Sequence, residues 1–95
     1  MATATITADL GFDRLVLKCD LAQASSPIRY LGGDDDDEWV TTPYQVADAR
    51  HDEHEAVALV VAWLGGEYYE DPSSDDSRED QLASLLERAT VKVAR

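Results

Sequence analysis

The stretch TATITADLGFDRLVLKCD, residues 3–20, decides the fold, because apolar side chains recur at every second position on both sides of a turn. Ala and Ile alternate with Thr at the start of the stretch, and Leu15, Leu17 and Cys19 share one face of its second half. The intervening Asp9-Leu10-Gly11 is typical of a turn. The pattern predicts a β-hairpin with one buried side.

The middle of the chain predicts a third strand and a short helix. Ile28 to Leu31 follows Pro27 and fits a strand. Thr42-Pro43-Tyr44-Gln45 fits a helix start, with Thr42 as the N-cap, proline at the first helical position and glutamine at the third. We therefore expect a helix over about residues 43–49.

Residues 52–64 predict the clearest helix. Asp52 can cap it, with Glu55 three residues later as the partner in a capping box. The apolar residues cover nearly the whole circumference, so we expect this helix at the buried centre of the fold, with Trp63 in the core. Gly65-Gly66 ends the helix. The apolar stripe consists of Val57, Val60, Val61 and Leu64.

A second helix is predicted after Ser77, which caps it together with Asp80. Its inward face consists of Leu82, Leu85, Leu86 and Ala89. Residues 90–95 fit either a helix or a strand. Together these elements predict a single α+β domain over residues 1–95, a small antiparallel β-sheet packed against one or two helices.

Charge is distributed unevenly along the chain. Residues 34–80 contain sixteen Asp or Glu against Arg50 and Arg78, whereas residues 1–33 are balanced, and the formal net charge is -12. We call residues 34–80 the acid block. Such a field disfavours direct binding to DNA, RNA or an anionic membrane and attracts basic partners.

Cys19 is the only cysteine, so an internal disulfide is impossible, and its position beside Leu15 and Leu17 predicts a buried core residue. The N-terminus lacks the basic and apolar regions of a signal peptide, and no stretch approaches the ~20 apolar residues of a membrane helix. The sequence therefore predicts a cytoplasmic protein.

Two patterns suggest metal ligands, and both fail. Residues 71–79 place Asp, Ser or Glu at alternate positions of a calcium loop, but Asp76 replaces the glycine of the sharp turn and Leu82 replaces the closing glutamate. His51 and His54 do not have the spacing of a zinc protease. We expect no enzyme activity, no metal and no cofactor.

The acid block is predicted to bind a partner. Trp39 abuts its first acidic run and Tyr68-Tyr69 lies between two glutamates, so these aromatic residues belong either to the core or to an interface. The predicted partner-binding residues are Asp34, Asp35, Asp36, Asp37, Glu38, Glu67, Glu70, Asp71, Asp75, Asp76, Glu79 and Asp80.

Three interpretations account for the acid block. The first is nucleic-acid mimicry: its net of fourteen negative charges equals ~24 Å of duplex at about one charge per ~1.7 Å. The second is adaptation to high internal salt, which predicts acids over the whole surface. The third is a protein-interaction module that binds a basic protein without imitating phosphate geometry.

In size and in its acidic runs Asp34–Glu38, Glu67–Asp71 and Asp75–Asp80, the chain resembles, as a class, the small acidic DNA-mimic inhibitors of phages and mobile elements, anti-CRISPR proteins among them. The resemblance implies an inhibitor that occupies the basic DNA- or RNA-binding channel of a nucleic-acid-binding protein or a CRISPR effector complex. It implies no direct contact with nucleic acid.

Overall fold

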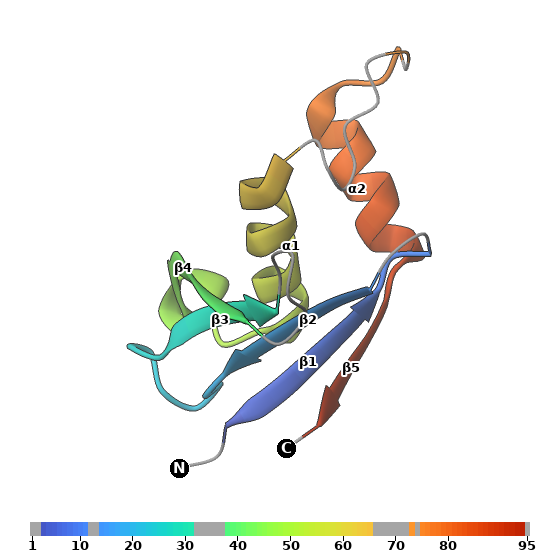
Figure 1. Cartoon of the computed structure of the whole chain (residues 1–95). Helices are drawn as coiled ribbons and strands as arrows, with labels where there is room; N and C mark the ends of the chain where they lie inside the picture. The colour runs from blue at the N-terminus through green and yellow to red at the C-terminus, as the bar shows by residue number, and fades with distance from the viewer. Residues whose placement is uncertain (1–2, 12–13, 32–37, 66–72, 74, 95) are drawn as a thin grey trace.

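Five antiparallel strands form one sheet in the computed structural model, which describes residues 3–11, 14–31, 38–65, 73 and 75–94 (Figure 1). The spatial order of the strands is β4-β3-β2-β1-β5. Their bounds are β1 Ala4–Asp9, β2 Arg14–Cys19, β3 Pro27–Leu31, β4 Trp39–Gln45 and β5 Thr90–Ala94. The α+β class and the antiparallel sheet predicted from the sequence are confirmed.

The predicted hairpin is β1 and β2. Ile6 lies opposite Leu17 in the register, and both side chains are buried. Gly11 has a φ of 94°, which a residue without Cβ adopts without strain, and its amide donates to Asp9 Oδ1 at 2.9 Å. The predicted third strand is β3, and it pairs with β2.

The C-terminal segment, for which the sequence left helix and strand open, is strand β5. Ala89 has the extended dihedrals of φ −72° and ψ 141°, so it ends the preceding helix, and β5 then pairs with β1 along the edge of the sheet. Val91 and Val93 are half-buried, whereas Lys92 between them is exposed. The alternation in sequence therefore follows the two faces of a sheet.

The predicted helix over residues 43–49 is wrong for its first half. Residues 39–45 form strand β4, and a 3-10 helix, η1, covers only Val46–Ala49. The Thr42 hydroxyl is buried and donates to the Ile28 carbonyl oxygen at 2.7 Å instead of capping a helix. Pro43 is tolerated because β4 is an edge strand with an irregular register against β3.

Two α-helices lie on the same side of the sheet: α1, Glu53–Leu64, and α2, Arg78–Arg88 (Figure 1). Both predicted N-caps are confirmed. Asp52 Oδ1 accepts from the His54 amide at 2.7 Å, and Ser77 Oγ accepts from the Asp80 amide at 3.2 Å. Gly65 ends α1 with a φ of 73°. No helix in the described ranges has the length and apolar character needed to span a bilayer.

The core lies between the sheet and α1, but α1 is not buried on all sides as the sequence suggested. Its buried residues form one stripe, Ala56, Val57, Val60 and Val61. Trp63, predicted as core, is 41% exposed because it lies about 90° around the helix from the centre of that stripe. Its ring packs edge-on against Tyr30, with the ring centroids 5.8 Å apart.

Candidate functional site

Five of the predicted partner-binding residues lie in the described part of the chain, and all five side chains are exposed. They are Glu38, Asp75, Asp76, Glu79 and Asp80. The other seven lie outside the described residues: Asp34, Asp35, Asp36, Asp37, Glu67, Glu70 and Asp71.

Four of the exposed acids form one cluster at the start of α2, which we call the acidic tip: Asp75, Asp76, Glu79 and Asp80. Ser77, a neutral residue, caps this helix. Glu79 and Asp80 therefore do not cap it, although their charges interact favourably with the helix dipole by about 0.3–1 kcal/mol each. The side chains of Glu79 and Asp80 are exposed to solvent.

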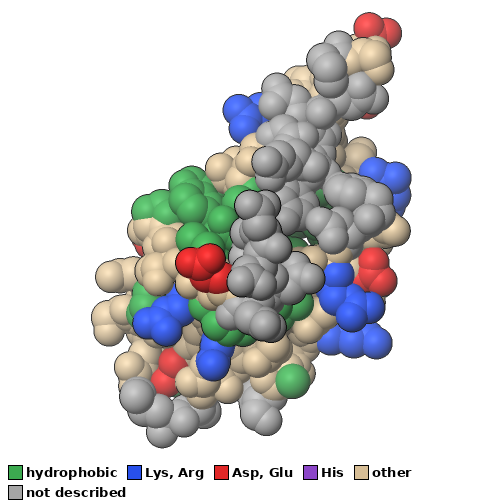
Figure 2. Space-filling model, viewed as in Figure 1, with side chains coloured by type: hydrophobic (Ala, Val, Ile, Leu, Met, Phe, Trp, Pro, Cys, Tyr) green, Lys and Arg blue, Asp and Glu red, His purple; other side chains and the backbone are tan. Residues whose placement is uncertain are grey.

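The acidic tip lies at the end of α1 that is remote from Asp52. A Cβ atom built on Gly65, the C-cap of α1, would be 3.3 Å from the Arg78 guanidinium, so α2 begins where α1 ends. The twelve residues of α1 then separate the tip from Asp52, at the start of that helix, by ~18 Å. Figure 2 shows acidic atoms at this far end of the molecule, whose longest dimension is 44 Å. Glu38 directly precedes β4, which is an edge strand of the sheet.

The acids in the middle of the acid block have local structural functions. Asp48 Oδ2 accepts from the Gln45 amide at 2.8 Å, and Asp52 caps α1. Glu53 and Glu55 lie in the first turn of α1, where the helix dipole favours negative charge. Part of the negative charge of residues 34–80 is therefore explained by helix stability alone.

Basic residues gather on the strands, a feature that the sequence analysis did not identify as a site. The five strands contain four bases and one acid, a net of +3, and all five of these side chains are exposed: Asp9, Arg14, Lys18, Arg29 and Lys92. Because they alternate with buried residues, they lie on the sheet face opposite α1 and α2, which we call the open face. Figure 2 shows Lys and Arg atoms over the strands.

Trp39 lies on the open face, so its side chain is at the surface and not in the core. Its side chain is 37% exposed, and Lys18 Nζ lies 5.5 Å from its ring centroid, a cation–π geometry. Tyr68 and Tyr69 lie outside the described residues. The alternation in β2 indicated the outward direction of Lys18, but only strand pairing places Arg29 directly opposite it.

The histidines and the cysteine have structural environments. His51 Nδ1 lies 2.8 Å from the Leu21 carbonyl oxygen, and Cys19 is buried as predicted. Burial, and secondarily the charge of Asp20, raises the pKa of the Cys19 thiol, which disfavours the reactive thiolate. Within the described ranges, no group of three His, Cys, Asp or Glu side chains is arranged to hold a metal ion. Part of the rejected calcium loop, Asp71, Pro72 and Ser74, lies outside those ranges.

Comparison with protein-family models, with curated proteins and with solved structures finds no match to this chain. The site must therefore be interpreted from its own geometry and charge.

Proposed function

We propose that this protein is an acidic inhibitor that binds the basic nucleic-acid channel of a target protein and excludes its DNA or RNA. The acidic tip carries the proposal, because its four carboxylates are exposed at one end of an elongated molecule and a neutral serine already caps the helix that presents them. A CRISPR effector complex is the kind of target that the resemblance implies, and such an inhibitor acts in the cytoplasm.

The magnitudes agree with occupation of such a channel. The four carboxylates of the acidic tip carry the charge of ~7 Å of duplex, and the acid block as a whole carries that of ~24 Å. A basic groove that binds this surface releases the counterions that it would release on binding phosphates, so affinity should fall steeply with salt. Between 50 and 200 mM salt we expect a loss on the order of tenfold to a hundredfold when about four partner cations are neutralised.

The proposal can be tested with purified nucleic-acid-binding targets, beginning with guide-loaded CRISPR effector complexes. A gel-shift assay would measure the concentration of this protein that displaces half of the labelled target DNA. The double variant Glu79→Gln/Asp80→Asn should inhibit at least about tenfold less well, since each lost charged contact is worth ~1.5–3 kcal/mol.

A matched control is available within the chain. Glu53→Gln/Glu55→Gln removes the same charge from the first turn of the other α-helix, with the same loss of dipole interactions. It should inhibit as the wild type does. Equal losses in both double variants would show that only net charge matters and would contradict a site at the tip.

A third variant addresses the acidic run that lies outside the described residues. Replacing Asp34, Asp35, Asp36 and Asp37 by Asn should leave stability unchanged or higher, because self-repulsion falls, while inhibition decreases.

If any target binds the chain and its DNA simultaneously, the mimic interpretation fails and the non-mimic interaction module takes its place. Salt adaptation is separated by a fourth measurement: a mimic should unfold cooperatively in dilute buffer, whereas a salt-adapted domain should be unfolded there.

A further inference from the structure

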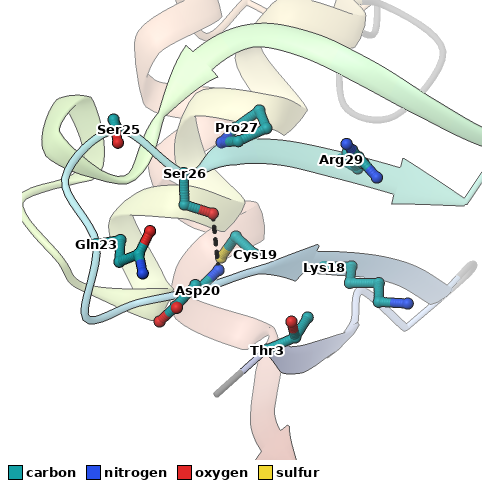
Figure 3. Close-up of a pocket in the computed structure, with 9 residues that line it drawn as sticks. All are labelled: Thr3, Lys18, Cys19, Asp20, Gln23, Ser25, Ser26, Pro27 and Arg29. Atoms are coloured by element: carbon teal, nitrogen blue, oxygen red, sulfur yellow. Dashed lines mark hydrogen bonds between the residues drawn. The ribbon is translucent and has the colours of Figure 1, made fainter. Parts of the chain in front are cut away.

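The open face contains a hollow of about 440 Å³ beside the turn that joins β2 to β3. Figure 3 shows Lys18 and Arg29 on the two strands, with Gln23, Ser25 and Ser26 on the turn that curves around the hollow. The lining thus combines two cations with hydroxyl and amide groups. A volume of this size falls within the ~300–1,000 Å³ of small-molecule sites.

The two cations occupy opposite positions on neighbouring strands. Lys18 lies directly opposite Arg29 in the register of β2 and β3, so their Cβ atoms are ~4.5–5.5 Å apart. Like charges in this position destabilise a sheet. Among the described residues, no acid forms an ion pair with Arg29, and the contact of Lys18 is with the Trp39 ring. A bound anion would remove this repulsion.

The Ser26 hydroxyl on the turn can donate a hydrogen bond to an anion. Ser26 Oγ accepts from the Asp20 amide at 2.9 Å, which leaves the hydroxyl proton to be donated to another group. Among the described residues, Asp20 is the one acid that lines the hollow, but Asp20 is only 8% exposed and its Oδ1 accepts from the Ala22 amide at 3.1 Å. Its repulsion of a ligand on the open face is therefore reduced.

The negative net charge of the protein does not prevent such binding. The acidic side chains of α1 and α2 belong to the layer on the other side of the sheet, and the molecule measures 22 Å along its shortest axis. Charges separated by more than ~8 Å are largely screened at physiological ionic strength. At the hollow, the two adjacent cations therefore outweigh the acids of α1 and α2.

We propose that the hollow binds a phosphate-bearing small molecule, with its phosphate held between the Arg29 guanidinium and the Lys18 ammonium. Arginine suits this role because its planar fork donates two parallel hydrogen bonds to phosphate oxygens. The Ser26 hydroxyl supplies a third donor, and the rest of the hollow accommodates the remainder of the molecule. This site is independent of the acidic tip and of the inhibitor function.

Titration of the full chain with ribose 5-phosphate and with inorganic phosphate, followed by amide NMR shifts, tests the proposal. We expect saturable shifts that include Gln23, Ser25 and Ser26, with dissociation constants in the millimolar range or below, and none with ribose. Arg29→Gln and Lys18→Gln should each weaken binding about tenfold or more, because each removes a charged contact.

Lys92→Gln is the matched control, since Lys92 is an exposed base on the same sheet face but on β5. It should bind within about twofold of the wild type, because β1 separates β5 from β2 and two strand spacings of ~4.8 Å exceed the ~8 Å screening length. Equal weakening by Lys92→Gln, or the absence of saturable shifts at millimolar ligand, would overturn the proposal. A single-stranded oligonucleotide that binds more than about tenfold tighter than ribose 5-phosphate would overturn the assignment to a small molecule in favour of a nucleic-acid backbone. Thermal unfolding of the three variants verifies that each is folded.

Discussion

The helical layer and the sheet of this protein carry opposite charge. The three helices contain six acids and two bases, a net of −4, whereas the five strands have a net of +3. The helices gain from acids in their first turns through the dipole, which no strand offers. The comparison teaches that a net charge of -12 is not a uniform property of the surface. One end of the molecule suits a basic partner and the opposite face of the sheet suits an anion.

The largest expected effect is a difference in unfolding free energy between substitutions at two adjacent residues that lie on opposite faces of the sheet. Leu17 is fully buried and Lys18 is exposed on the open face. Leu17→Ala should lower the free energy of unfolding by about 2–5 kcal/mol, since it removes buried methyl groups and leaves a cavity. Lys18→Ala should change it by less than about 1 kcal/mol. Urea unfolding measures both, and similar losses would contradict the assignment of the two faces.

The next effect concerns the two N-caps. Asp52→Ala and Ser77→Ala should each lower the unfolding free energy by about 0.5–2 kcal/mol, because an amide in the first turn loses its acceptor. Asp80→Asn retains the Ser77 cap and should lose only the dipole interaction of about 0.3–1 kcal/mol. Thermal unfolding of the three variants measures these losses. If Asp80→Asn were as costly as Ser77→Ala, the acids of the tip would be structural and less available to a partner.

A smaller effect of opposite sign is expected on the open face. Arg29→Thr should raise the unfolding free energy by about 0.2–1 kcal/mol in phosphate-free buffer, because it removes a like-charge pair and threonine favours a strand. The gain should shrink as salt screens the repulsion. A loss of stability at low salt would indicate that Arg29 has a partner within the protein and that its charge is not open to a ligand.

The smallest effect is confined to alkaline solution. Burial raises the pKa of Cys19, so the folded state holds this proton more tightly than the unfolded chain does. The contribution of the Cys19 thiol to the unfolding free energy is therefore fully present below the ordinary thiol pKa of ~8.5. It is lost as pH rises through the pKa of the folded state. Cys19→Ala should flatten the decline in unfolding free energy above about pH 8.5. An equally steep decline in this variant would assign the loss to other groups.

The sequence by itself determined the elements whose polarity pattern is strong and local. The alternation in residues 4–19 specifies a hairpin because one face must leave water, and a capping residue before an apolar stripe specifies α1 and α2 wherever they pack. It also predicted the burial of Cys19 and the exposure of the acids at the tip, since alternation along a strand and a run of charges are local patterns.

Tertiary structure decided what depends on residues far apart in the chain. Thr42 begins no helix, because the Ile28 carbonyl oxygen, fourteen residues away, accepts its hydroxyl proton and β3 pairs with β4. Trp63 leaves the core because the sheet covers only one side of α1. The cationic pair of Lys18 and Arg29 exists only through the register of two strands. Local patterns fix the state of a segment, but the free energy of pairing and burial fixes which segments meet.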